Sequence, residues 1–186
     1  IGDWSSDVCS SDLEESGEQI KSKSEYRFVI DPLDGTNNFL HGFPYWAISI
    51  GLEKAGEIIA GVVMSPVFDE IYHAEKGHGA YLNNQRIRVS NRSNFSDAFV
   101  ACGSPSSVRR KTKASYDIID VVTKISHEVS SVRCAGSAAI DLCKVASGCF
   151  DGLVELSLKK WDIAAGIIIV KEAGGKITDL SGEDNY

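Results

Sequence analysis

The order of strand-like and helix-like segments changes once along the chain, and this change limits the folds available to it. In the first half, short runs rich in β-branched and aromatic residues follow one another across brief turns, which is typical of an antiparallel meander. The predicted strands of this half are 26–30, 46–53, 58–65, 70–74, 80–82 and 86–89. The sequence therefore predicts mostly antiparallel sheet before about residue 95.

In the second half, strand and helix patterns alternate. We expect strands at 98–102, 131–134, 150–155 and 176–180, and helices at 112–127, 137–147 and 162–173. Glycines directly after two of these helices are typical helix stops. Such alternation indicates a layered α/β arrangement, so the fold class expected is α/β (α+β), an antiparallel meander half plus an α/β half. The boundary is placed in the polar stretch 91–96, with the antiparallel half over 14–95 and the α/β half over 96–186.

The two ends of the chain do not fit this pattern. The first 13 residues are rich in Ser and Asp and show neither the period of a helix nor the alternation of a strand. We expect no regular structure there and treat 1–13 as a non-native or disordered leader. At the other end the chain stops directly after the last predicted strand with no closing element, so the α/β half is expected to be C-terminally truncated.

Composition and charge narrow the functional classes. The chain has 186 residues, of which 43% are hydrophobic and 24% charged, which fits one globular domain. Its apolar runs are shorter than the roughly 20 residues that span a bilayer. Five widely spaced cysteines without a C-x-x-C pair argue against a disulfide framework and a zinc site, which favours a reducing, cytoplasmic location. A net charge of −7 argues against a broad nucleic-acid surface.

The most informative segment is DPLDGTNNF at 31–39, which directly follows the first predicted strand. Its proline fixes one φ angle and Gly35 frees another, so the chain folds back and brings Asp31, Asp34 and the Leu33 carbonyl oxygen to one side. Oxygen ligands of this kind are those that Mg²⁺ prefers. For the short Asp-Pro-x-Asp pattern alone, a plain turn with two solvated aspartates is the alternative.

Further acidic residues and a helix start extend this hypothesis. The segment 36–38 is typical of a first helical turn, whose unpaired N–H groups favour a bound anion. Glu14 precedes the first strand, and Asp162 lies at or near the N-cap of the helix 162–173. Taken alone, Glu14 is more simply a solvated loop charge and Asp162 a helix cap. Together, Glu14, Asp31, Asp34 and Asp162 can hold two cations, and bound cations let an acidic pocket accept phosphate.

These segments resemble the inositol monophosphatase family. Residues 31–39 and 161–175 are similar to its two signatures, Glu-Glu-Ser at 14–16 lies upstream as in the family, and 136–139 resembles its Gly-Ser-Ala-Ala segment. Asn37, commonly Thr in the family, departs from the pattern. The resemblance covers about residue 14 to the end. It implies a layered α-β-α-β-α sandwich of the sugar-phosphatase type and a lithium-sensitive enzyme that uses two or more Mg²⁺ ions.

The resemblance also implies roles for individual residues. It assigns metal binding to Glu14, Asp31, the Leu33 carbonyl, Asp34 and Asp162. It assigns catalytic roles to Glu14, Thr36 and Asp34, with Glu14 and Thr36 orienting and activating a water molecule. It assigns phosphate binding to the amides of Gly35 and Thr36, and contacts with substrate hydroxyls to Asp34, Gly136, Ser137, Ala138 and Glu155.

The implied reaction is hydrolysis of myo-inositol phosphate by direct attack of a metal-activated water, without a covalent intermediate. Alternatives are fructose-1,6-bisphosphatase, 3′(2′),5′-bisphosphate nucleotidase and histidinol-phosphatase. The Asn38-Phe39 pair after Gly35-Thr36 favours the inositol branch. A non-catalytic role with RNA or the transcription machinery is an alternative of another class. The resemblance implies a homodimer with a small phosphorylated substrate, and neither a membrane nor nucleic acid is an expected partner.

Overall fold

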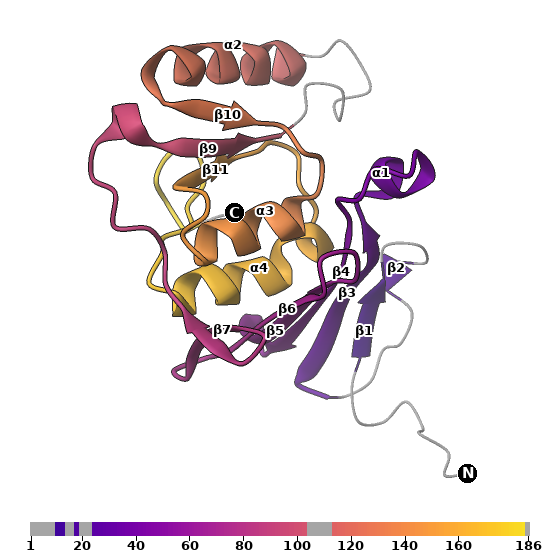
Figure 1. Ribbon diagram of the computed structural model, residues 1–186. Helices are drawn as coiled ribbons and strands as arrows, with labels where there is room; N and C mark the ends of the chain where they lie inside the picture. Colours follow the sequence, from indigo (N-terminus) through magenta and orange to yellow (C-terminus); the bar gives the residue numbers. More distant parts are fainter. Residues whose placement is uncertain (1–9, 14–16, 19–23, 104–112, 185–186) are drawn as a thin grey trace.

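The computed structural model describes residues 10–13, 17–18, 24–103 and 113–184, shown as ribbons in Figure 1. Its first half contains β1 (Ser10–Leu13), β2 (Gly17–Glu18), β3 (Tyr26–Asp34), α1 (Thr36–Leu40), β4 (Ala47–Lys54), β5 (Glu57–Ser65), β6 (Glu70–Glu75), β7 (Gly79–Leu82) and β8 (Gln85–Ile87). Its second half contains the 3₁₀ turn η1 (Phe95–Asp97), β9 (Phe99–Cys102), α2 (Lys113–Glu128), β10 (Ser131–Arg133), α3 (Ala138–Ala146), β11 (Gly152–Val154) and α4 (Lys160–Glu172).

The first half forms one large sheet. Its strands lie in the order β2-β1-β3-β4-β5-β6-β7-β8, and from β3 onward each strand is antiparallel to the next, as a meander requires. In β4 the residues alternate strictly between buried and partly exposed, because successive side chains of a strand point to opposite faces. The predicted antiparallel half is therefore confirmed.

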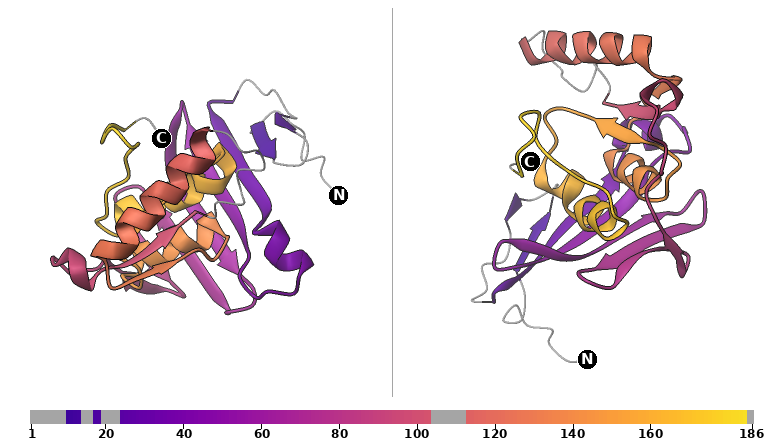
Figure 2. Two further views of the ribbon diagram at one scale, coloured as in Figure 1. Left: turned by 90° about the horizontal axis from the view of Figure 1, so that it is seen from above. Right: turned by 90° about the vertical axis from the view of Figure 1, so that its left-hand side faces the viewer.

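The second half adds three layers above this sheet. Helices α3 and α4 lie on one face of the large sheet, and the parallel three-stranded sheet β10-β9-β11 lies on the other side of these helices (Figure 1). Helix α2 covers the outer face of the small sheet, as the side view in Figure 2 also shows. The main core lies between the large sheet and the helix pair and includes Val63, Tyr72, Ile140 and Ile169. The predicted layered α/β class is thus confirmed.

Helix α4 packs unusually close to the large sheet. A Cβ atom at Gly61 in β5 would lie 2.8 Å from the Cα of Ala165 in α4, so glycine is required for this approach. Ala164 and Ala165, the α4 residues nearest the sheet, are almost completely buried. The short distance between helix and sheet brings the start of α4 close to the end of β3, where the candidate site lies.

Three predictions about secondary structure differ from the structure. Residues 176–180 form no strand: their β-branched pattern is suitable, but they pair with no described strand, and strand propensity alone does not supply a ladder partner. Residues 10–13, expected to be irregular, form β1, which pairs in parallel with β3. The segment Ser-Ser-Asp-Leu has no apolar–polar alternation, so its sequence pattern does not reveal the backbone pairing. Finally, β3 continues past the predicted end at residue 30 to Asp34.

The division of the chain into two halves at residue 95 stays a prediction. Helix α4, from the later half, packs on strands of the earlier half.

The outer face of the large sheet carries partly exposed apolar side chains, among them Phe28, Val62, Met64 and Ile71, which are 39–42% exposed. Within the described residues no helix covers this face. None of the described helices combines the length and apolar character needed to cross a membrane.

Candidate metal centre

Asp31 and Asp34 lie at the end of β3 on the same face of the large sheet. In a regular strand, residues three positions apart point to opposite faces. Here the pairing of β3 with β4 shifts between Asp31 and Asp34, so that Asp31 pairs with Ser49 and Asp34 with Ala47. The two carboxylates therefore point to the side of the helices, where Asp31 is 1% and Asp34 8% exposed. The backbone irregularity at Pro32-Leu33 places both acids at one site.

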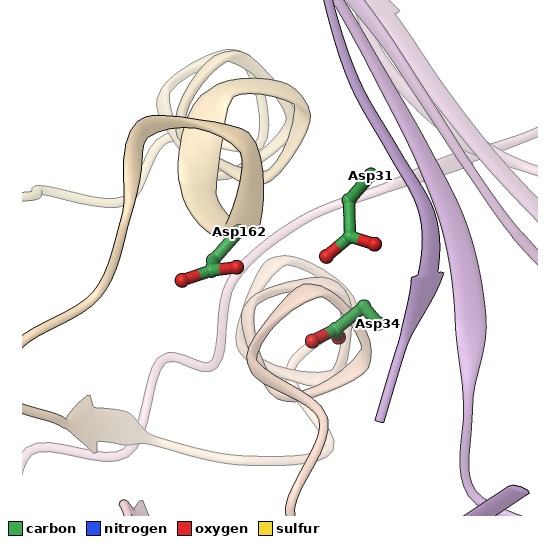
Figure 3. A group of neighbouring side chains, drawn as sticks. All are labelled: Asp31, Asp34 and Asp162. Atoms are coloured by element: carbon green, nitrogen blue, oxygen red, sulfur yellow. The ribbon is translucent and has the colours of Figure 1, made fainter. Parts of the chain in front are cut away.

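The third acid comes from a distant part of the chain. Asp162, in the first turn of α4, faces the two aspartates of β3 (Figure 3). One ligand atom from each of Asp31, Asp34 and Asp162 lies within 4.8 Å of the others. The predicted grouping of these three residues is thus seen in the structure. Asp162 is the third residue of the helix rather than its N-cap, which is Lys159.

Each carboxylate is oriented by a described hydrogen bond. The Leu33 amide donates to Oδ1 of Asp31 at 2.9 Å. The Lys159 amide donates to Oδ2 of Asp162 at 2.6 Å. Oδ2 of Asp34 accepts from the Ser137 hydroxyl at 2.5 Å and from the Ala139 amide at 2.9 Å. Hydrogen bonds of this kind fix the direction of ligand oxygens before a metal binds.

The residues present fit a divalent cation. Three carboxylates held this close together repel one another unless positive charge lies between them. All three donors are oxygens, which suits Mg²⁺ rather than zinc. Ser49, the β4 partner of Asp31, is 0% exposed, and its hydroxyl is the one buried side-chain polar atom among the described residues without a hydrogen bond. A buried hydroxyl without a partner is unusual and lies on the strand residue paired with Asp31.

Leu33 and Thr36 contact each other. The Thr36 hydroxyl donates to the Leu33 carbonyl at 3.0 Å, which joins a predicted metal ligand to a predicted water-orienting residue. Between them Gly35 adopts a φ of 87°, and a Cβ atom there would lie 2.9 Å from the Tyr45 carbonyl oxygen. This left-handed turn, favoured by glycine, ends β3 and starts α1. Glu14, the remaining predicted ligand, lies outside the described residues.

Glu155 lies just beyond β11. Burial, and then the charges of Asp141, Asp34 and Asp162, raise the pKa of Glu155 to about 7. Glu155 is thus near enough to Asp34 and Asp162 for their charges to act on it. Gly136 is exposed in the loop before α3, whereas Ser137 and Ala138 are 1% and 5% exposed. The predicted contacts of Gly136, Ser137, Ala138 and Glu155 with substrate hydroxyls stay predictions.

A buried acid that the sequence analysis missed lies behind the cluster. Asp141 in α3 is 1% exposed and accepts a hydrogen bond from the Tyr45 hydroxyl at 2.6 Å. Burial raises the pKa of Asp141 to about 7. The bond from Tyr45 lowers this pKa, by less than burial raises it, and the charge of Asp34 adds a smaller increase. A single acid inside the apolar run Ala-Ala-Ile-Asp-Leu-Cys was the available signal.

Fold and site together define a layered α/β protein with a candidate centre for divalent cations. The chain belongs to the inositol monophosphatase family, which it matches over residues 5–186. It is 46% identical to an inositol-1-monophosphatase of Rhizobium meliloti over 171 residues, which are 91% of this chain and 63% of that protein. It is 46% identical to a fructose-1,6-bisphosphatase/inositol-1-monophosphatase of Aquifex aeolicus, covering 92% of this chain and 65% of that protein.

Two further relatives carry another name. A putative Nus factor SuhB of Neisseria meningitidis is 46% identical, over 93% of this chain and 65% of that protein. The crystal structure of the extragenic suppressor protein suhB from Bartonella henselae superposes with a TM-score of 0.89 at 44% identity, covering 95% of this chain and 66% of that one. The chain thus spans about two thirds of the length of these relatives, from 63% to 66%.

Proposed function

We propose that the intact protein hydrolyses small phosphate monoesters with the help of Mg²⁺, and that myo-inositol monophosphate is its substrate. The observation that carries the proposal is the cluster of Asp31, Asp34 and Asp162, whose ligand atoms lie within 4.8 Å of one another. Membership of the inositol monophosphatase family supports the same chemistry. The name of the Rhizobium meliloti relative supports the choice of substrate.

The roles of the residues follow from this proposal. Bound divalent cations neutralise phosphate oxygens and lower the pKa of water, so that it attacks at neutral pH. Asp31, Asp34 and Asp162 hold the cations with Glu14 and the Leu33 carbonyl. Glu14 and Thr36 orient and activate the attacking water, and the amides of Gly35 and Thr36 bind the phosphate. Gly136, Ser137, Ala138 and Glu155 contact the substrate's hydroxyl groups.

A phosphate-release assay tests the proposal. The intact protein is assayed on inositol 1-phosphate, fructose 1,6-bisphosphate, 3′-phosphoadenosine 5′-phosphate and histidinol phosphate, each with and without Mg²⁺ and with added Li⁺. We expect release that requires Mg²⁺, is inhibited by Li⁺ and is fastest with inositol 1-phosphate. If another substrate is preferred, the inositol assignment is wrong while the phosphatase assignment stands. If no substrate gives Mg²⁺-dependent release, the whole proposal is wrong.

A second candidate function is supported by the Nus factor name of the Neisseria meningitidis relative. It is a role in a transcription complex, beside or instead of catalysis. A variant without the Asp34 carboxylate separates the two functions, because loss of a metal ligand stops hydrolysis and leaves the outer surface unchanged. Binding of the intact protein to RNA at physiological salt, retained in Asp34→Asn, would support this second role.

Two features of the biological setting belong to the same proposal. The four cysteines in the described part of the chain, Cys102, Cys134, Cys143 and Cys149, are free thiols, which fits a cytoplasmic location. The family resemblance implies a homodimer. Fractionation of cells and light scattering of the purified intact protein measure these two properties directly.

A further inference from the structure

The side chain of Asn38 connects three segments around the candidate metal centre. Its Nδ2 atom donates to the Tyr45 carbonyl at 2.6 Å and to the Ala135 carbonyl at 2.8 Å, and the Gly136 carbonyl lies at 3.3 Å. An Asn amide has two hydrogens, so the two shorter bonds use its full donor capacity. Ala135 and Gly136 lie 97 and 98 positions away in the sequence, in the loop that leads to α3.

These bonds complete a closed ring of backbone and hydrogen bonds that includes Asp34. From Asp34 the chain runs through Gly35 to Asn38, whose amide bonds the Ala135 carbonyl. From Ala135 the chain runs to Ser137, whose hydroxyl donates back to Oδ2 of Asp34 at 2.5 Å. Only two short stretches of backbone and two hydrogen bonds make up this ring. A change at the Asn38 bond therefore acts on the Ser137 bond to the carboxylate.

The ring is tightly packed. A Cβ atom at Gly35 would lie 2.9 Å from the Tyr45 carbonyl oxygen and 3.3 Å from the Gly136 carbonyl oxygen. A Cβ atom at Gly136 would lie 3.3 Å from Nδ2 of Asn38. Both glycines have positive φ angles, 87° and 85°. Because the two backbones already touch at glycines, the ring has little freedom to adjust while the Asn38 bonds are intact.

We propose that Asn38 is a positioning residue of the metal centre: it fixes the loop 135–137 against α1, and this holds the Ser137 hydroxyl on Asp34. The inference rests on the proposed function, in which Asp34 binds Mg²⁺. Groups that hydrogen-bond a metal ligand, as Ser137 bonds Asp34, change metal affinity or activity by about 10–100-fold when removed. In this role Asn38 acts through Ser137 and not directly on the substrate or the ion.

The test compares Asn38→Ala with Asn37→Ala in the intact protein. Asn37 is the neighbouring residue of the same type, with an exposed side chain that makes no hydrogen bond within the described residues. Calorimetric titration with MgCl₂ gives the affinity of each variant. We expect about tenfold weaker Mg²⁺ binding for Asn38→Ala and an unchanged affinity for Asn37→Ala. Turnover at saturating Mg²⁺ then falls less than turnover at low Mg²⁺.

A double-mutant cycle with Ser137→Ala distinguishes an effect transmitted through Ser137 from a nonspecific loss of rigidity around the site. If Asn38 acts through Ser137, Asn38→Ala weakens Mg²⁺ binding in the wild type and adds almost nothing in Ser137→Ala. Should Asn38→Ala fail to fold, as judged by circular dichroism, Asn38→Asp replaces it, since it keeps the volume and removes the donor. Unchanged affinity in both Asn38 variants, or an equal loss on the Ser137→Ala background, would overturn the proposal.

A metal-free measurement separates this inference from the proposed function. The Ala139 amide donates to Oδ2 of Asp34 at 2.9 Å, so its hydrogen exchange reports how firmly Asp34 is held. We expect about tenfold faster exchange at Ala139 in metal-free Asn38→Ala than in metal-free Asn37→Ala. If the wild type binds no Mg²⁺ but this difference is present, the metal function fails and the positioning role stands. Equal exchange in the two variants contradicts the positioning role.

Discussion

Ser137 donates its hydroxyl hydrogen to Oδ2 of Asp34 at 2.5 Å, although the two residues lie 103 positions apart. Ser137 is also the N-cap residue of α3, where its oxygen accepts from the Ile140 amide. One hydroxyl therefore caps a helix and orients a candidate metal ligand. As a consequence, the geometry of the acidic cluster depends on how α3 packs against β3, and not only on the local turn that follows β3.

Replacing Asp34 by Asn tests the central ligand. The change removes a charge with little change in volume, so we expect Mg²⁺-dependent phosphate release to fall roughly a thousandfold, equivalent to several kcal/mol of lost charge stabilisation. The metal-free variant should unfold at the same or a higher temperature than the wild type, because repulsion among the three acids falls. Phosphate release and thermal unfolding followed by circular dichroism measure the two effects.

The matched control is Asp120→Asn, which changes an exposed acid on α2. Its activity and unfolding temperature should equal those of the wild type. Retained activity in Asp34→Asn would mean that Asp34 is not a ligand.

Ser49 gives a second prediction of increased stability, from a different cause. Its hydroxyl is buried without a hydrogen bond, and such a group costs about 1–3 kcal/mol. We therefore expect Ser49→Ala to raise the free energy of unfolding of the metal-free protein by about 1 kcal/mol, measured by urea denaturation. Ser65→Ala is the control: Ser65 is equally buried, but its hydroxyl lies 3.5 Å from the Trp46 carbonyl, so no gain is expected. A less stable Ser49→Ala would show that the hydroxyl has a partner.

Ser49 also illustrates what the sequence can and cannot predict. The sequence predicts that Asp31 and Asp34 converge, and the structure has them in one cluster with Asp162. The expected cause, a chain that folds back between the two acids, is wrong: β3 continues to Asp34, and a shift in its pairing with β4 turns both side chains to one face. The place of Ser49 beside Asp31 likewise depends on the register between β3 and β4. Register is set by the whole buried face of the sheet, which no local motif reveals.

The same reasoning accounts for the errors in secondary structure. Elements with a clear local signal, such as the strands β4 and β5 and the helix α4, which glycines follow, were predicted to within one or two residues. In contrast, β1 forms because β3 offers it a backbone partner, and residues 176–180 form no strand because none of the described strands pairs with them. The bond between Asn38 and Ala135 belongs to the same class, since it depends on two segments meeting after the layers have packed.

Asp141 should make stability depend on pH. Burial raises its pKa in the folded protein to about 7 from an ordinary value of 3.8. The folded state then holds a proton that the unfolded state releases, so the contribution of Asp141 is complete below pH 3.8 and is lost as the pH rises through 7. Asp141→Asn does not titrate. Relative to the wild type, its free energy of unfolding should therefore rise between pH 5 and 8, by at most about 1.4 kcal/mol for each pH unit.

Urea denaturation of the metal-free proteins at four pH values across this range measures the difference. The pKa of Glu155 is also raised to about 7, in part by the charge of Asp141, so both proteins carry Glu155→Gln to remove this second titration. A constant difference between Asp141→Asn and the wild type at every pH would show that Asp141 ionises at its ordinary pKa.

Comparing alanine variants at Gly35 and Gly56 separates the cost of a positive φ angle from the cost of a steric clash. Gly35→Ala places a side chain on a residue with φ of 87° and brings its Cβ to 2.9 Å from the Tyr45 carbonyl oxygen. Gly56 has a φ of 91°, but a Cβ there meets nothing within 4 Å. Gly56→Ala should therefore lower the free energy of unfolding only by the backbone strain, about 1–2 kcal/mol. Gly35→Ala should cost more and should also lower turnover, because relief of the clash displaces Tyr45 or the Asp34–Thr36 turn. Urea unfolding and phosphate release of both variants test this, and equal costs would mean that the contact between Gly35 and Tyr45 has no energetic role.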